Sequence, residues 1–329
     1  MSDSITIRNK GQINVVFNQQ KRDGTPPVAV KREGESRHYP LDQIEAKMKR
    51  LIGLEEVKKT IREIYAWLYI NRLRKQYQLK AETQTLHMLF KGNPGTGKTT
   101  VARLLGELFA EMGILAKGHL IEAERADLVG EYIGQTAQKT RDLIKKAQGG
   151  ILFVDEAYSL ARGGEKDFGK EAIDTLVKHM EDKKDDFILI LAGYSKEMDR
   201  FMKMNPGLPS RFPIIITFPN YTDQELFSIS EQMLQDREYK LTTEARWKLN
   251  RHLKQKVAEN ERDFSNGRYV RNIIEKSIRR QAVRCLREGA FDRESLMTIR
   301  AVDLTFDDTS SRHSETEAET LDDRVFFSE

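Results

Sequence analysis

The chain has 329 residues, of which 39% are hydrophobic and 32% are charged, and its formal net charge is +4. This length suits one large or two medium globular domains, and so small a net charge does not point to nucleic acid or a membrane surface as a partner. The single cysteine, Cys285, excludes an internal disulfide. The N-terminus lacks the apolar core of a signal peptide, and no apolar run is long enough to span a bilayer. These features predict a soluble, cytoplasmic protein.

Composition divides the chain into four sections. Residues 1–40 are polar and contain three Pro, which predicts an N-terminal arm and linker. Residues 307–329 carry eight acidic residues against two Lys or Arg. With so little to bury, they are expected to form a disordered acidic tail. Between these ends, residues 41–220 are predicted to form an α/β domain and residues 221–306 a smaller helical domain.

Five short apolar runs alternate with helical patterns in the predicted α/β domain. They are LHMLF (86–90), HLIEA (119–123), ILFVD (151–155), FILILAG (187–193) and FPIIITF (212–218). Three of them are nearly continuous Val, Ile, Leu and Phe, which suits strands buried on both faces of a parallel sheet. The sequence therefore predicts an α/β fold with a parallel five-stranded sheet, followed by a small all-helical domain.

A glycine-rich loop, GNPGTGKTT (92–100), follows the first predicted strand and opens an amphipathic helix. It has the P-loop pattern G-x-x-x-x-G-K-[ST], in which backbone N–H groups turn toward one point and the helix N-terminus adds partial positive charge. Lys98 is expected to reach the β- and γ-phosphates, and the Thr99 hydroxyl to hold Mg²⁺. The nucleotide-binding residues predicted here are Gly92, Asn93, Pro94, Gly95, Thr96, Gly97, Lys98, Thr99 and Thr100.

Two carboxylates end the predicted strand in ILFVDEA (151–157). Asp155 is expected to bind the Mg²⁺ hydration shell, and Glu156 to orient or deprotonate a water that attacks the γ-phosphate. The structural alternative is an acidic pair that caps a helix. A small-molecule kinase could share the loop and the Asp, but the adjacent Glu favours water as the acceptor. The sequence contains no NKxD motif for guanine, so ATP is the predicted substrate.

With these motifs in this order, the chain resembles the AAA+ ATPases over about residues 50 to 300. LIGLEEVKK (51–59) is similar to a family segment that lies near the adenine, which implies a role for Ile52 and Gly53 in nucleotide binding. Two longer stretches, GYSKEMDRFMKMNPGLPSRF (193–212) and FSNGRYVRNIIEKSIRRQAVR (264–284), resemble the CbbX/CfxQ group. Within that group the resemblance extends to a sporulation protein of spore-forming bacteria, which implies a link to sporulation. CbbX itself is a rubisco activase, but no residue here identifies rubisco as the client.

The resemblance also implies two functional arginines and a hexameric ring. NPGLPSRF (205–212) resembles the segment that ends in the arginine finger, which implies Arg211. SNGRYVRN (265–272) resembles sensor 2, which implies Arg268, with Arg271 as the second choice. An arginine supplied by a neighbouring subunit would couple hydrolysis to assembly. For either arginine the alternative is a surface ion pair.

One position departs from the family pattern. Many AAA+ proteins place a polar sensor residue, often Asn, after the fourth strand. Here the fourth predicted strand ends in AGYS, which puts Tyr194 or Ser195 at the sensor 1 position. A tyrosine hydroxyl could polarise water or could simply pack.

The loop GEYIGQT (130–136) bears on what the ATPase acts upon. In AAA+ rings that thread polypeptides, an aromatic–aliphatic–glycine triplet follows the second strand and faces the pore. Tyr132, Ile133 and Gly134 match that triplet, and an aromatic side chain can grip an extended chain without reading its sequence. RGGEKDFGKE (162–171) is the candidate for a second, charged pore loop. The alternative for Tyr132 is packing against the next helix.

The predicted function is therefore an ATP-dependent protein-remodelling motor that forms a homo-oligomeric ring and acts on a protein client. A nucleotide-gated DNA clamp or helicase loader is one alternative, and an ATP-dependent regulatory switch is the other. No basic patch with interleaved aromatics supports the loader, so no nucleic acid or membrane partner is expected.

Overall fold

The computed structural model describes residues 39–81, 85–132, 134–162, 167–182, 186–204, 207–259 and 264–306. The N-terminal arm up to residue 38, Ile133 and the acidic tail therefore lie outside the described residues. Four residues of the candidate second pore loop, 163–166, also lie outside them. The domain boundaries proposed from composition stay predictions.

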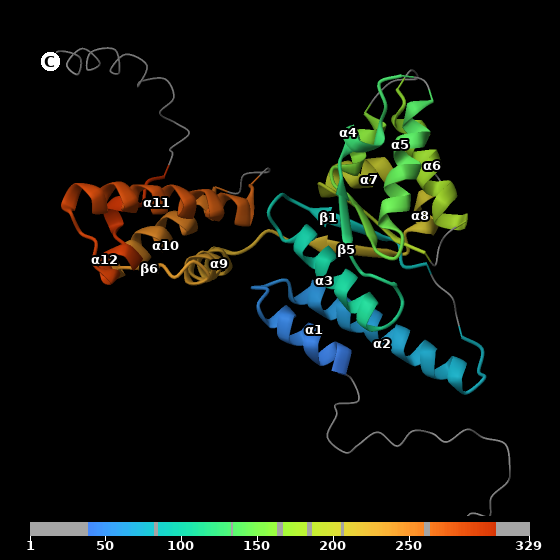
Figure 1. Ribbon diagram of the computed structural model, residues 1–329, viewed down its shortest axis with the longest axis horizontal. Coiled ribbons are helices and arrows are strands. Elements are labelled where there is room, and N and C mark those ends of the chain that lie inside the picture. Colours follow the sequence, from blue (N-terminus) through green and yellow to red (C-terminus); the bar gives the residue numbers. More distant parts are fainter. Residues whose placement is uncertain are drawn as a thin grey trace, which may run out of the picture. The chain divides into compact units, whose positions relative to one another are not determined.

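A five-stranded parallel sheet forms the centre of the first domain (Figure 1). Its strands are β1 (Met88–Gly92), β2 (Leu120–Ala123), β3 (Ile151–Val154), β4 (Ile188–Gly193) and β5 (Ile214–Phe218). The spatial order is β2-β3-β4-β1-β5, and every neighbouring pair is parallel. All five strands coincide with the apolar runs, so the predicted fold class is confirmed.

Burial along each strand follows its place in the sheet. The inner strands β3 and β4 are buried throughout, whereas β5 at the edge alternates between buried and exposed residues. Ile215 on β5 is 51% exposed although it lies in an apolar run. An edge strand has one unpaired side, so an apolar run there need not be buried on both faces.

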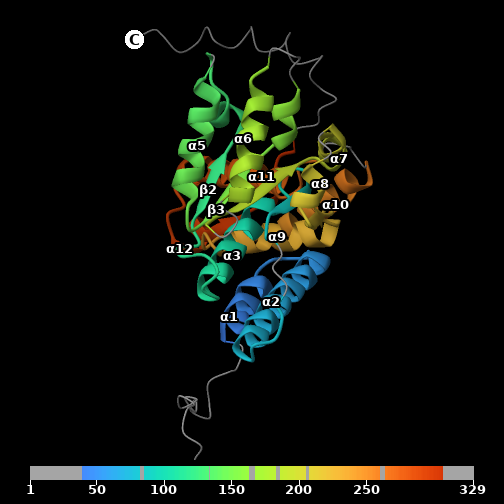
Figure 2. The same cartoon turned by 90° about the vertical axis from the view of Figure 1, so that its right-hand side faces the viewer.

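Helices cover both faces of the sheet. One face packs against α1 (Tyr39–Lys49), α2 (Glu55–Gln76) and α3 (Lys98–Glu111), and the other packs against α4 (Arg125–Leu128), α5 (Gln135–Ala147), η1 (Ala157–Ala161), α6 (Gly169–Asp182), α7 (Ser195–Met204) and α8 (Leu208–Arg211). Successive strand residues supply opposite faces: Phe90 packs toward the α3 side and Leu89 toward the α6 side. Figure 2 shows α5 and α6 side by side, as their many contacts require.

Helix α3 begins and ends at glycines. Gly97 has φ +95° and Gly113 has φ +70°, a region that L-residues with a Cβ rarely adopt. Between them, Val101, Leu105 and Leu108 are fully buried, as the helical spacing of apolar residues predicts. The helix is therefore fixed on the sheet with its N-terminal end at the glycine-rich loop.

The second domain is helical, apart from a short sheet. Its elements are α9 (Asp223–Gln235), β6 (Lys240–Leu241), α10 (Thr243–Ala258), α11 (Asn266–Glu288), α12 (Arg293–Met297), β7 (Thr298–Ile299) and η2 (Ala301–Asp303). Strands β6 and β7 form a parallel pair with two residues each. The prediction of an all-helical domain missed this pair because strands so short leave no alternating pattern.

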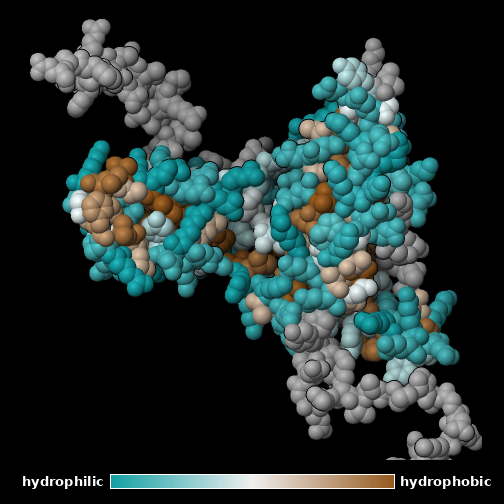
Figure 3. Space-filling view, viewed as in Figure 1, coloured by the Kyte–Doolittle hydropathy of each residue, from teal (hydrophilic) through white to brown (hydrophobic). Residues whose placement is uncertain are grey.

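None of the helices in the described ranges is long and apolar enough to cross a membrane. The surface drawn in Figure 3 is mostly hydrophilic, with exposed apolar residues at one end of the helical domain. These include Leu286 on α11, which is 70% exposed, and Phe291 just before α12, which is 63% exposed.

Candidate active site

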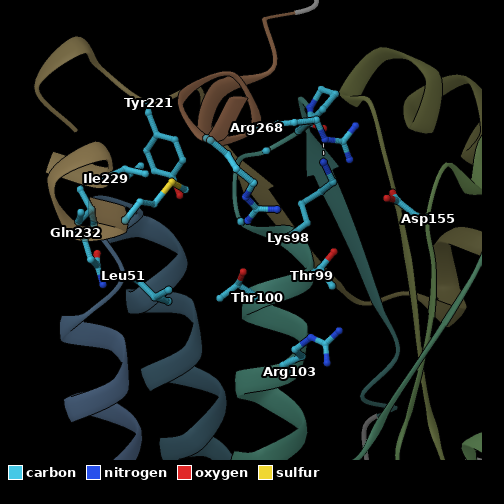
Figure 4. Close-up of a pocket in the computed structure, with 18 of the residues that line it drawn as sticks. Leu51, Lys98, Thr99, Thr100, Arg103, Asp155, Tyr221, Ile229, Gln232 and Arg268 are labelled. Atoms are coloured by element: carbon cyan, nitrogen blue, oxygen red, sulfur yellow. Dashed lines mark hydrogen bonds between the residues drawn. The ribbon is translucent and has the colours of Figure 1, made fainter. Parts of the chain in front are cut away.

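A cavity of about 720 Å³ lies at the carboxyl ends of β1, β3 and β4 and extends to the helical domain. Its lining includes Gly92, Pro94, Gly95, Gly97, Lys98, Thr99, Thr100, Asp155, Glu156, Tyr194, Arg268 and Arg271. In open α/β sheets, ligands bind beyond the carboxyl ends of the strands. Figure 4 shows Lys98 between Arg268 of the helical domain and Thr99 of α3, with Asp155 across the cavity.

The glycine-rich loop disfavours side chains at three of its positions, at two by close packing and at one by its backbone conformation. A Cβ on Gly92 would lie 2.5 Å from the Phe218 carbonyl oxygen, and one on Gly95 would lie 2.2 Å from the Ser265 carbonyl oxygen. At Gly97 the φ of +95° itself disfavours a side chain. Helix α3 has no side-chain N-cap and no acidic residue in its first turn. Its first N–H groups and its positive end are therefore available to an anion.

Lys98 is the half-buried cation of this loop. Its ammonium group donates to the backbone carbonyls of Gly92 and Asn93, both at 2.9 Å. Burial lowers the pKa of Lys98 below its ordinary value, and Arg268 lowers it further, whereas Asp155 and Glu156 act in the opposite direction. An anionic ligand beside the ammonium would stabilise its charged form, which is the behaviour expected of a phosphate-binding lysine.

Asp155 and Glu156 follow β3 directly. The Asp155 backbone N–H donates to the Ala123 carbonyl at 3.0 Å, which continues the pairing with β2 by one residue. The Asp155 carboxylate accepts the Glu156 backbone N–H at 2.9 Å. Glu156 has φ 45°, and its side chain makes no helix-capping hydrogen bond to η1. Helix capping therefore does not account for the Glu156 carboxylate, which lines the cavity.

The residues present fit a Mg²⁺–nucleotide. The Thr99 hydroxyl and the Asp155 carboxylate are oxygen donors of the kind Mg²⁺ prefers, and they line the same cavity as Lys98. Mg²⁺ in phosphate sites is held by one or two protein groups together with phosphate oxygens. The described part of the chain contains no cluster of three or more His, Cys, Asp or Glu able to hold a metal alone.

Tyr194 lines the cavity, and Ser195 begins α7 and does not. The Tyr194 ring lies 6.1 Å from the ring of Tyr158, which is buried behind Glu156. Burial raises the pKa of Tyr158 to about 12, with a further contribution from the Glu156 carboxylate. Of the two sensor 1 candidates, the structure thus brings Tyr194 to the site.

The helical domain closes the cavity through contacts that the sequence did not reveal. Asn266, fully buried at the start of α11, accepts the Tyr221 N–H at 2.9 Å and donates to the Asn220 side chain at 3.0 Å. The Tyr221 hydroxyl donates to the Thr96 carbonyl at 3.1 Å. The Gly267 N–H donates to the Gly95 carbonyl at 3.1 Å. Since these contacts hold the start of α11 against the glycine-rich loop, both Arg268 and Arg271 reach the cavity.

Asn93 and Thr96 of the glycine-rich loop and two residues of the segment before it were also predicted to bind nucleotide. Asn93 and Thr96 lie outside the cavity lining and make hydrogen bonds within the protein. Asn93 donates to the Asn220 side chain at 2.9 Å, and the Thr96 hydroxyl donates to the Asn93 carbonyl at 2.8 Å. Ile52 lines the apolar end of the cavity with Ile229 and Met233. Gly53, with φ +64°, lies outside the lining, and a Cβ there would lie 2.1 Å from the Glu225 carboxylate.

Arg211 does not line the cavity of its own chain. It ends α8, where its guanidinium forms an ion pair with Glu181 of α6 and donates to the Gly207 carbonyl. The surface ion pair expected as the alternative is therefore present. An arginine remote from its own cavity is also what a finger acting on a neighbouring subunit requires.

The candidate pore loop projects its aromatic residue to the surface. Tyr132 is 67% exposed, so it is not packed against the next helix. Gly134 has φ +82°, and no atom of the described residues beyond its chain neighbours lies within 4 Å of the position of a Cβ. The Gly130 N–H is held by the Thr136 hydroxyl at 2.9 Å. The middle residue of the triplet, Ile133, is one of those that the structure does not describe.

Comparison with known proteins places this site in a family. Residues 88–220 match the family model "ATPase family associated with various cellular activities (AAA)", and residues 222–314 match the "AAA lid domain". The FIGL-1 AAA domain, solved in complex with ADP, superposes with a TM-score of 0.53 over 85% of this chain and 95% of that chain. At 17% identity this likeness shows the fold alone.

Curated relatives are much closer in sequence. Stage V sporulation protein K of Bacillus subtilis is 59% identical, with 94% of this chain and 98% of that protein covered. Protein CbbX of Cereibacter sphaeroides is 44% identical, with 83% and 87% covered. The chloroplastic ribulose bisphosphate carboxylase/oxygenase activase of Cyanidioschyzon merolae is 44% identical, with 78% and 88% covered. The chain therefore belongs to the AAA ATPases, in the group of CbbX, CfxQ and stage V sporulation protein K, and it is an ATPase.

Proposed function

We propose that the protein is an ATP-hydrolysing remodelling motor that works on a polypeptide client. The proposal of ATP hydrolysis rests on one observation, a single cavity that is lined by Lys98, Thr99, Asp155, Glu156 and Arg268. Together these residues supply phosphate-binding cations, Mg²⁺ ligands and a base beside the γ-phosphate position. The proposed substrate is ATP, because the sequence lacks a guanine-reading motif.

The chain's own residues have distinct proposed roles. Lys98 and Arg268 neutralise phosphate charge, and Arg268 also reports the presence of the nucleotide to the lid. Mg²⁺, held by Thr99 and Asp155, would supply further charge neutralisation at the phosphate oxygens. Glu156 orients water and accepts its proton at the carboxylate.

The proposed assembly is a homo-oligomeric ring, with a hexamer as the expected size. Arg211 supports it, because this residue is remote from its own cavity and can act only on another subunit's nucleotide. The exposed Leu286 and Phe291 offer apolar surface for subunit contacts. A head-to-tail contact that closes on itself gives such a ring.

The exposed Tyr132 supports the threading mode. An aromatic side chain in a loop with glycines can grip a chain by contact area and can move with the nucleotide state. Similarity to the sporulation protein supports a role in sporulation. The client is proposed to be a protein, and the similarity to CbbX does not extend to naming rubisco.

The test uses Glu156→Gln as a trap that holds ATP and client together. Proteins retained by this variant are compared with those retained by Glu156→Gln/Tyr132→Ala and by Glu156→Gln/Tyr132→Phe. Retention is expected to depend on an aromatic residue at 132, while Tyr132→Ala alone keeps ATP binding and turnover. If Tyr132→Ala remodels a trapped client at the normal rate, the threading mode is wrong. If DNA is retained instead of protein, the loader alternative is favoured.

A further inference from the structure

Arg211 is held on two sides by hydrogen bonds. Its Nε–H donates to Glu181 Oε1 at 3.0 Å, and Nη2 donates to the same carboxylate oxygen. On the opposite side, Nη1 donates to the Gly207 carbonyl at 2.6 Å. The Arg211 side chain is 28% exposed and that of Glu181 is 60% exposed. The guanidinium is thus fixed at the surface.

These contacts leave one edge of the guanidinium available. A guanidinium has five N–H donors in a rigid plane, and Nε–H lies on the same side as one Nη2 hydrogen. Glu181 takes that side, and Gly207 accepts one Nη1 hydrogen. Among the described residues, these contacts leave one hydrogen on each Nη atom. This pair on the terminal nitrogens supplies the two donors with which a guanidinium binds phosphate oxygens.

The elements that carry both partners of the ion pair are anchored in the core. Leu208, the first residue of the short helix α8, and Phe212, directly after it, are each 1% exposed. Met180, next to Glu181 on α6, is 2% exposed and packs in the same apolar cluster. The carboxylate and the guanidinium are therefore brought together by two rigid elements. A long arginine side chain otherwise loses considerable rotamer entropy when it is fixed.

We infer that Glu181 is a positioning residue for the arginine finger. It braces Arg211 so that the terminal N–H pair faces outward, toward the γ-phosphate bound by a neighbouring subunit. The inference rests on the proposed function, in which Arg211 acts in trans. Because Glu181 acts through Arg211, it does not contribute to nucleotide binding by its own chain.

The experiment compares Glu181→Ala with Glu181→Gln in the assembled full-length protein. Loss of the brace is expected to lower kcat for ATP about 10- to 100-fold, the effect of a misplaced catalytic group, with KM nearly unchanged. Glu181→Gln keeps the accepting oxygen and is expected to retain most of kcat. Asp174→Ala is the matched control, since Asp174 is exposed on the same helix two turns earlier. Thermal unfolding and size-exclusion chromatography check that each variant folds and assembles.

A double variant separates positioning from a general structural effect. If Glu181 works through Arg211, then Glu181→Ala/Arg211→Ala is no slower than Arg211→Ala alone. Normal kcat in Glu181→Ala, with Arg211→Ala inactive, would overturn the inference and leave the finger intact. A glutamine variant as slow as the alanine variant would also overturn it. Retained turnover in Arg211→Ala would instead contradict the proposed finger, and the brace with it.

Discussion

Glu156 occupies an unusual position for a non-glycine residue. Its φ of 45° lies in the left-handed region, which costs free energy unless the surroundings impose it. Here β3 ends two residues earlier, the Asp155 carboxylate accepts the Glu156 N–H, and Tyr158, two residues later, is buried. This backbone brings two consecutive acidic residues to one cavity, where the proposed role of Asp155 is to hold a metal and that of Glu156 is to activate water.

Replacing Glu156 by glutamine is expected to separate binding from chemistry. The amide keeps the size of the side chain but cannot accept a proton, so ATP turnover should fall about 10²- to 10⁴-fold. Nucleotide affinity, measured by titration with a fluorescent ATP analogue, should change little. Lys98→Ala provides the contrast, since it should lose affinity as well. Turnover near the normal rate in Glu156→Gln would remove this residue from its proposed role.

His87 is a buried titratable residue outside the active site. It is 2% exposed, and its Nδ1 accepts the Leu189 backbone N–H at 3.0 Å, so it is neutral with the proton on Nε2. Burial lowers the pKa of His87 to about 4. Between pH 6.5 and about 4, the unfolded chain binds a proton here and the folded chain does not. The contribution of neutral His87 to the free energy of unfolding is therefore complete above pH 6.5 and is lost as the pH falls through this window.

The His87→Gln variant tests that linkage. Glutamine does not titrate, and its amide oxygen can accept the Leu189 N–H. From pH 7.5 to pH 4, its free energy of unfolding should fall by about 3 kcal/mol less than that of the unmodified protein. Urea unfolding at a series of pH values gives both curves. Parallel curves would show that His87 is already accessible to protons in the folded state.

Sequence patterns predicted the residues of the glycine-rich loop and the carboxylate pair because each set lies within one short stretch. Their geometry is set by the local chain, so spacing alone carries the information. Asn266 and Tyr221 were missed because their partners are distant along the chain. Tyr221 N–H and Asn266 are 45 positions apart, and the Tyr221 hydroxyl and Thr96 are 125 apart. One local signal was present for Asn266: it follows Ser265, a residue type that is favoured directly before a helix, at the start of a helical pattern.

At the scale of elements, the sheet was predictable and its details were not. Apolar runs identified all five strands, and the runs of β3 and β4 are nearly continuous because burial on both faces removes polar residues from the pattern. The exposed Ile215 shows that such a run does not reveal an edge. Strands β6 and β7 pair across 58 positions, from Lys240 to Thr298. Their pairing depends on how α10, α11 and α12 pack, which no local pattern encodes.

The contact between the glycine-rich loop and α11 gives a prediction for Gly95. A Cβ at this position would lie 2.2 Å from the Ser265 carbonyl oxygen and 2.7 Å from the Arg268 backbone nitrogen. Gly95→Ala should therefore push the start of α11 away and lower nucleotide affinity at least about tenfold, or 1.4 kcal/mol. The affinity is measured by titration with a fluorescent ATP analogue.

Gly113→Ala is the matched control for Gly95→Ala. Gly113 also has a positive φ, at +70°, but within the part of the chain that the structure describes no atom beyond its chain neighbours lies within 4 Å of its Cβ position. Its substitution should cost about 1 kcal/mol of folding stability and leave affinity unchanged. Equal affinity in the two variants would mean that the loop and α11 do not need to touch for nucleotide to bind.

At the scale of the whole molecule, the site is divided between two places on one chain. The cavity holds the residues proposed to bind phosphate and activate water, while Arg211 lies elsewhere, in an ion pair with Glu181. In the proposed function, a single chain therefore carries an incomplete site together with the arginine that completes the site of a neighbour. This division is what would make hydrolysis depend on assembly.

Mixing two inactive variants tests that dependence. Lys98→Ala should be inactive because it does not bind ATP, and Arg211→Ala should lose about 10³-fold or more in kcat because its neighbours lack the finger. In a random 1:1 mixture, about half of the cavities belong to Arg211→Ala subunits and are intact. About half of these lie beside a Lys98→Ala subunit, whose Arg211 is intact. Since an active site needs both, activity should recover to about one quarter of the normal value. Turnover is measured after the subunits have exchanged, with unmixed samples as controls. A mixture no more active than its components would mean that Arg211 does not act across a subunit boundary.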